Sequence, residues 1–227
     1  MRILKLVGAT LAPVVLFGVA LFVPAGTIHW WRAWVFLGVV LVCNAVTMIW
    51  VFAGDEALLN ERYGSPIQKG QPLADKIVAN LFVLSFFVML LSIPGDVFHL
   101  HIFEAPAPLV AFAGLLTFVA GWILIASAMH ENTFAAPVVK HQEERHQRTI
   151  TTGAYAFVRH PMYTSLVLLA PGMALWLGSY AAALLSIVPI VLIAVRIVFE
   201  ERFLRRELPG YEAYTQQVRY RLVPFIW

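Results

Sequence analysis

Long apolar runs dominate the chain and determine the architecture that we expect. A helix needs about 20 mostly apolar residues to cross the roughly 30 Å of hydrocarbon in a bilayer. Six segments have or approach this pattern: residues 6–23, 30–52, 76–93, 108–129, 163–177 and 180–199. The pattern predicts an all-α, polytopic membrane helical bundle of about six transmembrane helices.

The last two segments are expected to form a tight C-terminal helical hairpin. Only Gly178 and Ser179 separate them, which leaves room for a short turn. Pro171 and Pro189 lie inside the two arms. Because proline removes a backbone donor and clashes with the preceding turn, we expect a kink in each arm.

Composition agrees with a membrane protein. Of 227 residues, 60% are hydrophobic and only 13% are charged, whereas soluble domains carry about a quarter charged residues. We expect a single membrane domain over residues 1–227, with four helices in 1–129 and a functional core in 130–227. Arg2 and Lys5 precede the first apolar run as in a signal peptide, but no small-x-small cleavage site follows, which favours a retained helix.

The basic residues orient the bundle. Lys and Arg concentrate at the N-terminus, in residues 62–76, in residues 140–159 and after residue 201, so that alternate connections are basic. The positive-inside rule then places both termini and any site formed by 131–160 and 200–227 on the cytoplasmic side, and we expect a bacterial inner membrane. The net charge of +3 fits contact with anionic lipid headgroups, and we expect the bilayer as a partner and no nucleic acid.

The first candidate motif precedes the fifth apolar segment. It combines Gly153, Tyr155, His160 and Tyr163 at the membrane boundary, and Pro161 suits the first turn of a helix. Two interpretations are open: an interfacial belt of aromatic and basic side chains, or a ligand site. With a single cysteine, Cys43, in an apolar run, neither a disulfide framework nor a metal site is expected.

The second candidate motif lies in the last apolar segment. Arg196 and Glu200 are four residues apart and therefore share a helix face. A charge within an apolar run is costly unless it is paired or faces a cavity. Arg196 therefore either snorkels and pairs with Glu200, or recognises a carboxylate in a pocket where Glu200 accepts hydrogen bonds from a polar ligand.

Together these motifs resemble a known family. The sequence of residues 153–163, followed by an apolar hairpin and by residues 196–201, resembles the isoprenylcysteine carboxyl methyltransferases. The related phospholipid methyltransferases share much of the pattern. Residues 132–152 and the tail 204–224 also look like this family. The convincing resemblance covers residues 130–227, whereas the first four helices match mainly in hydropathy.

The resemblance implies a pocket for S-adenosylmethionine without a Rossmann domain, and the chain has no G-x-G-x-x-G motif. Carried over by position, the cofactor-binding residues are Lys140, Gln147, Arg148, Thr149, Ile150, Tyr155, His160, Pro161, Met162, Tyr163 and Glu200. Arg196 would be the catalytic residue that faces the methyl acceptor. The chain departs from the family at Ala154, where proline is frequent, at Ser165, where glycine is frequent, and at Gln147, where histidine is frequent.

The expected activity is methyl transfer from S-adenosylmethionine to a membrane-associated acceptor. A carboxylate is already nucleophilic and needs orientation by Arg196, whereas an amine must first lose a proton. Only Glu200 and Glu201 are expected within reach of such a proton, which favours carboxyl O-methylation of an isoprenylcysteine-like or other lipidic or small-molecule substrate. The alternatives are a phosphatidylethanolamine N-methyltransferase, a non-catalytic membrane transporter or factor, and a sterol-type reductase that uses NADPH.

Overall fold

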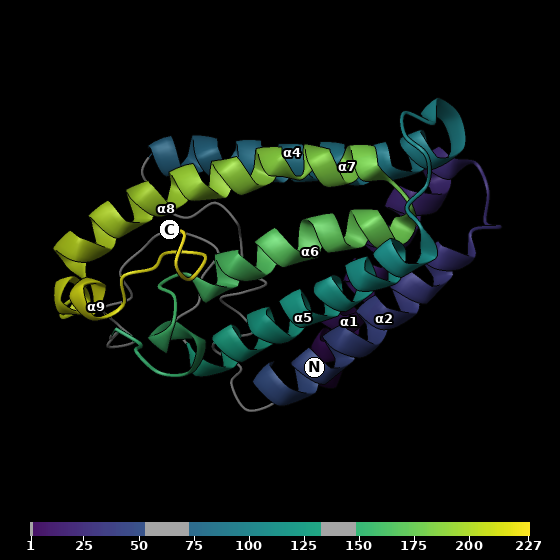
Figure 1. Cartoon of the computed structure of the whole chain (residues 1–227). Helices are drawn as coiled ribbons and strands as arrows, with labels where there is room; N and C mark the ends of the chain where they lie inside the picture. Colours follow the sequence, from purple (N-terminus) through teal and green to yellow (C-terminus); the bar gives the residue numbers. More distant parts are fainter. Residues whose placement is uncertain (1, 53–72, 133–148) are drawn as a thin grey trace.

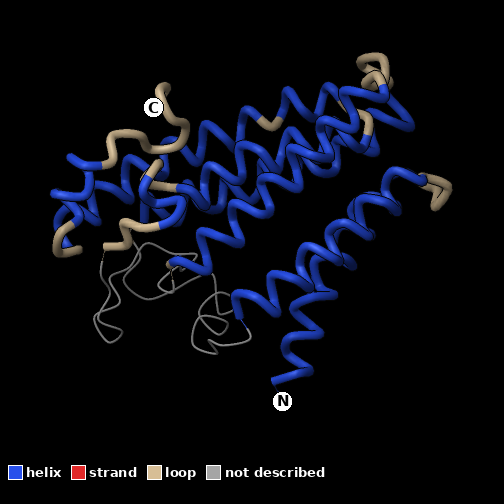
Figure 2. The backbone as a smooth tube through the Cα atoms, turned by 60° about the horizontal axis from the view of Figure 1, so that its bottom comes forward, coloured by secondary structure: helices blue, strands red, loops and turns tan. Residues whose placement is uncertain are grey.

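The computed structural model describes residues 2–52, 73–132 and 149–227, and every regular element in these ranges is helical (Figure 2). The α-helices are α1 (Arg2–Ala25), α2 (Trp31–Thr47), α4 (Leu73–Gly95), α5 (Pro108–Glu131), α6 (Pro161–Leu177), α7 (Tyr180–Leu185), α8 (Ile187–Glu207) and α9 (Tyr211–Gln217). Two π-helical turns, η1 (Met48–Phe52) and η2 (Asp96–Leu100), extend α2 and α4, and a 3₁₀ turn, η4 (Gly153–Ala156), precedes α6. The predicted all-α fold class is confirmed.

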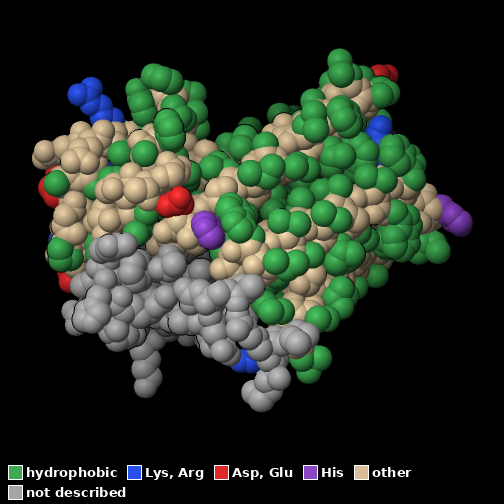
Figure 3. Space-filling view, turned by 90° about the horizontal axis from the view of Figure 1, so that it is seen from below, with side chains coloured by type: hydrophobic (Ala, Val, Ile, Leu, Met, Phe, Trp, Pro, Cys, Tyr) green, Lys and Arg blue, Asp and Glu red, His purple; other side chains and the backbone are tan. Residues whose placement is uncertain are grey.

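The described helices fit a multi-pass membrane protein. Five are long and apolar enough to cross a bilayer, and α6 is a shorter apolar helix of 17 residues. Each of the six predicted segments therefore corresponds to a helix. Hydrophobic side chains cover much of the surface seen in Figure 3. Because such a surface is stable only against lipid, the apolar exterior agrees with the membrane assignment.

Glycines bring α5 and α6 close together. A Cβ atom on Gly172 would lie 2.7 Å from the carbonyl oxygen of Gly114 and 2.7 Å from the backbone nitrogen of Phe118. A Cβ on Gly121 would likewise approach the carbonyl oxygen of Ser165 at 3.0 Å. Small residues allow helix backbones to approach in this way inside a membrane, where packing rather than the hydrophobic effect drives association.

The turn between the last two helices is as short as predicted. Gly178 ends α6 with φ +105°, a left-handed conformation that favours glycine. Ser179 then begins α7: its Oγ accepts a hydrogen bond from the Ala182 amide at 2.9 Å and donates one to Asp96 Oδ2 at 2.6 Å. This turn is thereby fixed to the segment that follows α4.

The predicted kink at Pro189 takes the form of a break between two helices. α7 ends at Leu185, and α8 begins at Ile187. Leu185 lies four residues before Pro189, at the position whose carbonyl a proline ring displaces. In the other arm, Pro171 lies within α6, which is helical from end to end.

The two arms of the hairpin pack on different neighbours. In Figure 1, α6 runs along α5, whereas α7 and α8 run along α4. The start of α6, the end of α8 and the start of α4 consequently lie at the same end of the bundle. The first motif precedes α6 and the second lies in α8, so the fold brings both motifs to this end.

The C-terminal tail returns to the start of α6. The backbone amides of Arg159 and His160 donate to the carbonyl oxygens of Tyr220 and Arg221 at 2.9 and 3.0 Å. Thr164 Oγ1 donates to the Leu222 carbonyl oxygen at 2.6 Å. The tail is therefore part of the structure that surrounds the first motif.

Substitution of Gly172 by alanine should destabilise the bundle by about 1–3 kcal/mol, because the new methyl group meets backbone atoms that cannot move aside. Gly38→Ala is the matched control: it is also inside a membrane helix, but a Cβ there meets nothing within 4 Å. Thermal unfolding in detergent measures both variants. Equal midpoints for the two would contradict close packing of α5 on α6.

Candidate active site

The segment before α6 is anchored on the end of α5. Gly153 has φ +57°, a left-handed conformation that favours glycine, and a Cβ there would lie 2.7 Å from the side chain of Glu131. Thr152 Oγ1 donates to Glu131 Oε2 at 2.8 Å. Asn132 Nδ2 donates to the Tyr155 hydroxyl at 3.1 Å. These contacts position the chain that carries the first motif into α6.

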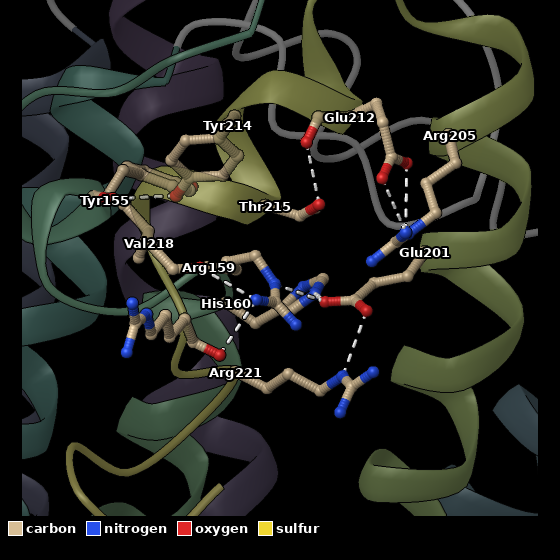
Figure 4. Close-up of polar contacts among 11 residues, drawn as sticks. Tyr155, Arg159, His160, Glu201, Arg205, Glu212, Tyr214, Thr215, Val218 and Arg221 are labelled. Carbon is tan, nitrogen blue, oxygen red and sulfur yellow. Dashed lines mark hydrogen bonds and ion pairs between the residues drawn. The ribbon is translucent and has the colours of Figure 1, made fainter.

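Glu201 is the centre of a buried charge cluster (Figure 4). It is 3% exposed and accepts hydrogen bonds from Arg159 Nε at 2.6 Å and Arg221 Nε at 2.9 Å. His160 Nε2 lies 3.2 Å from the same carboxylate. Arg159 also donates through Nη1 to the carbonyl oxygens of residues 218 and 219. The cluster joins α8, the start of α6 and the tail.

Glu200, the preceding residue, has different surroundings. The Tyr163 hydroxyl donates to Glu200 Oε2 at 2.7 Å. The rings of His160 and Tyr163 stack with centroids 5.7 Å apart and an interplanar angle of 21°. Glu200 is half-buried, whereas Glu201 is buried. Glu200 therefore keeps capacity to accept a hydrogen bond from a ligand.

Arg196 pairs with a carboxylate from another helix. Its Nε donates to Asp75 Oδ1 at 2.9 Å, and the two residues are only 9% and 2% exposed. The guanidinium also lies 5.9 Å from the centroid of the Tyr163 ring. Of the two interpretations of Arg196, pairing with Glu200 is wrong. From the sequence we also expected Glu200 and Glu201 to be the only acids near enough to take a proton from an amine acceptor. That expectation is wrong, because α4 places Asp75 beside Arg196.

The structure brings His160, Tyr163, Arg196 and Glu200 together, as predicted. Pro161 is the first residue of α6, and Met162 is half-buried. The other described residues with a predicted cofactor role lie further along the anchored segment: Thr149, whose Oγ1 donates to the Pro209 carbonyl at 3.1 Å, half-buried Ile150, and buried Tyr155. Lys140, Gln147 and Arg148 lie outside the described residues.

Sequence reasoning gave no site role to Asp75, Arg159, Arg221 or Tyr211, and it considered Glu201 only as an acid near the acceptor, not as the centre of a charge cluster. The signal available for Asp75 and Glu201 was an acid at the end of an apolar segment, a place where a charge needs a partner. No local pattern indicated which partner each acid has. The tail arginine Arg221 carried no signal at all, since its role depends on the return of the chain from α9.

Two tyrosines of α9 face this region. The Tyr214 hydroxyl donates to the Tyr155 carbonyl oxygen at 2.7 Å. Burial raises the pKa of Tyr214, and it raises the pKa of Tyr211, with a further increase from the negative charges of Glu201 and Glu200. Both hydroxyls therefore stay protonated and act as donors at neutral pH.

Comparison with known proteins supports a class for this fold and site. Residues 109–209, which contain both motifs, match the family model of the phospholipid methyltransferases. The chain is also similar to the solved structure of the eukaryotic intramembrane Ras methyltransferase, isoprenylcysteine carboxyl methyltransferase, at 15% identity and a TM-score of 0.48, covering 98% of this chain and 95% of that one. No curated protein matches the chain in a sequence search. The family match confirms, over residues 109–209, the resemblance to the phospholipid methyltransferases seen in the sequence.

Glu201→Gln should lower the stability of the protein by about 3 kcal/mol or more, because it leaves buried Arg159 without its counter-charge. Glu212→Gln is the matched control: Glu212 pairs with Arg205 on an exposed surface, where such pairs contribute less than about 1 kcal/mol. Denaturant or thermal unfolding in detergent compares them. A similar small loss in both variants would show that the Glu201 cluster does not stabilise the fold.

Proposed function

We propose that this site binds S-adenosylmethionine and transfers its methyl group to a lipidic or small membrane-associated acceptor, with carboxyl O-methylation of an isoprenylcysteine-like substrate as the leading reaction. The observation that carries the proposal is the hydrogen bond between Tyr163 and Glu200, with His160 and Arg196 both close to the tyrosine ring. It joins the two motifs, 37 residues apart, at one end of the bundle.

The residues present fit such a cofactor. Its methionine part carries an ammonium group and its ribose carries hydroxyls, both of which donate hydrogen bonds that the half-buried Glu200 carboxylate can accept. The buried Tyr211 hydroxyl, which has no partner among the described residues, supplies a donor. When bound, the cofactor supplies a methyl group on a positively charged sulfur for in-line displacement.

Arg196 is proposed to orient the acceptor. A guanidinium has five N–H donors in a planar fork, the geometry that matches a carboxylate, and one of these donors, Nε, is bonded to Asp75. That bond also fixes the plane of the guanidinium. A carboxylate held by such a fork needs no base, because it is already the nucleophile.

A small apolar cavity lies between α4, α6 and α8. Seven side chains line it: Phe82, Phe86, Leu166, Ala170, Pro189, Ile190 and Ile193. The same three helices carry Asp75, Tyr163 and Arg196, which form the polar end of the proposed site. We infer, from the distribution of basic residues, that this end faces the cytoplasm of a bacterial inner membrane.

A second candidate reaction is N-methylation of phosphatidylethanolamine. Asp75 favours it, since a carboxylate beside Arg196 offers a base that an amine acceptor needs. The match to the phospholipid methyltransferase model favours it as well. The two reactions differ in the atom that receives the methyl group, and the products can therefore be separated chemically.

Titration with S-adenosylhomocysteine should show saturable binding that Glu200→Gln weakens about 10-fold or more, the usual effect of losing a charged hydrogen-bond acceptor. Calorimetry or a ligand-induced rise in the unfolding midpoint measures it in detergent. Glu212→Gln, on the exposed surface, should bind like the wild type. Absence of binding by the wild type at millimolar ligand would refute the proposed function.

The acceptor is tested with a cofactor labelled in its methyl group. Incubation with N-acetyl-S-farnesylcysteine should give a methyl ester, from which base releases volatile labelled methanol. Phosphatidylethanolamine vesicles would instead give a base-stable N-methyl product. Arg196→Lys, which keeps the charge but loses the fork, should lower ester formation at least 10-fold while leaving S-adenosylhomocysteine affinity within a factor of about two. If label appears only in a base-stable lipid, and the Asp75→Asn variant does not form that product, the reaction is N-methylation of phosphatidylethanolamine instead.

A further inference from the structure

The hydroxyl of Tyr211 stands out among the buried polar groups. Within the described residues it is the one buried side-chain oxygen or nitrogen without a hydrogen-bond partner, and the residue is only 4% exposed. Folded proteins satisfy nearly all such groups, because a buried donor without a partner has lost its hydrogen bond to water. A group left in this state calls for an explanation.

Tyr211 lies beside residues of the proposed cofactor site. It is the first residue of α9 and packs in a cluster with buried Tyr155 and with half-buried Ile150 and Met162. All three of these have a predicted cofactor role. The charges of Glu201 and Glu200 also act on its hydroxyl. Tyr211, whose hydroxyl has no partner among the described residues, therefore packs in the same cluster as residues of the proposed cofactor site.

The surroundings limit which ligand atom this hydroxyl can meet. Because the raised pKa keeps the hydroxyl protonated, it acts as a donor and needs an acceptor on the ligand. A ligand carboxylate is better matched by a charged donor such as an arginine than by a neutral hydroxyl, so the acceptor assigned to Tyr211 is a neutral one. The neutral acceptors of S-adenosylmethionine are the ribose oxygens and the adenine ring nitrogens.

We infer that Tyr211 is a cofactor-binding residue whose hydroxyl donates a hydrogen bond to the nucleoside part of S-adenosylmethionine. This inference rests on the proposed function and adds to it a contact from α9. The C-terminal helix thus becomes part of the binding site rather than only a support for it.

Tyr214, three residues further along α9, provides an internal comparison. It is also buried, and its hydroxyl donates to the Tyr155 carbonyl oxygen at 2.7 Å. The fold therefore satisfies the Tyr214 hydroxyl and leaves that of Tyr211 for a ligand. Removing the hydroxyl of Tyr214 should therefore destabilise the free protein, whereas removing the hydroxyl of Tyr211 should weaken ligand binding.

The experiment compares Tyr211→Phe with Tyr214→Phe in full-length protein purified in detergent. In the absence of ligand, Tyr211→Phe should leave the unfolding midpoint unchanged or raise it, whereas Tyr214→Phe should lower it. Affinity for S-adenosylhomocysteine should fall about 3- to 10-fold in Tyr211→Phe, the effect of one neutral hydrogen bond. Affinity for 5′-methylthioadenosine, which has the nucleoside without the amino acid, should fall by the same factor.

The outcomes separate the two levels of the proposal. A wild-type protein that binds neither ligand would refute the proposed function, and the role of Tyr211 with it. Normal binding by the wild type and by Tyr211→Phe would overturn the inference about Tyr211 alone. A loss for S-adenosylhomocysteine but not for 5′-methylthioadenosine would overturn the assignment to the nucleoside. A lower midpoint of the ligand-free Tyr211→Phe protein, matching that of Tyr214→Phe, would show a structural role instead.

Discussion

The buried carboxylate of Glu201 is the group on which the rest of the site depends. Moving a carboxylate out of water costs several kcal/mol, and only well-placed partners offset that cost. Here the partners come from two other segments of the chain: Arg159 before α6 and Arg221 from the tail. The tail therefore contributes one of the groups that offset the burial of Glu201. Because consecutive helical residues point about 100° apart, fixing Glu201 toward these arginines turns Glu200 toward Tyr163.

Among the described residues, the charges of the site balance. Three arginines, Arg159, Arg196 and Arg221, stand against three carboxylates, Asp75, Glu200 and Glu201. An unbalanced set at the edge of an apolar bundle would be costly. The partners are nevertheless distributed unequally: Glu201 is surrounded by donors, whereas Glu200 receives a hydroxyl from Tyr163. One carboxylate therefore organises the site, and the other is suited to a polar ligand.

The parts of this structure that the sequence predicted are those encoded locally. Apolar runs located the five helices that are long enough to cross a bilayer and the shorter apolar helix α6, and Pro161 correctly marked the start of α6. The proximity of Tyr163 and Glu200 followed from a short hairpin between two motifs. Asp75 could not be found in this way, because it meets Arg196 across 121 residues, and only the packing of α8 on α4 brings them together. The contact of Arg221 with Glu201 could not be predicted for the same reason.

The divergence of the hairpin arms explains why a polar site can exist at the end of an apolar bundle. Had α6 and α8 packed closely on each other, Arg196 would have had only its own hairpin to pair with. Instead, the glycines of α5 and α6 allow α6 to pack closely on α5, whereas α7 and α8 both follow α4 on the other side. Helix α4 then supplies Asp75 as the missing counter-charge. The helix contacts that hold the arms apart thus also bring in the counter-charge that stabilises a buried arginine beside Tyr163 and Glu200.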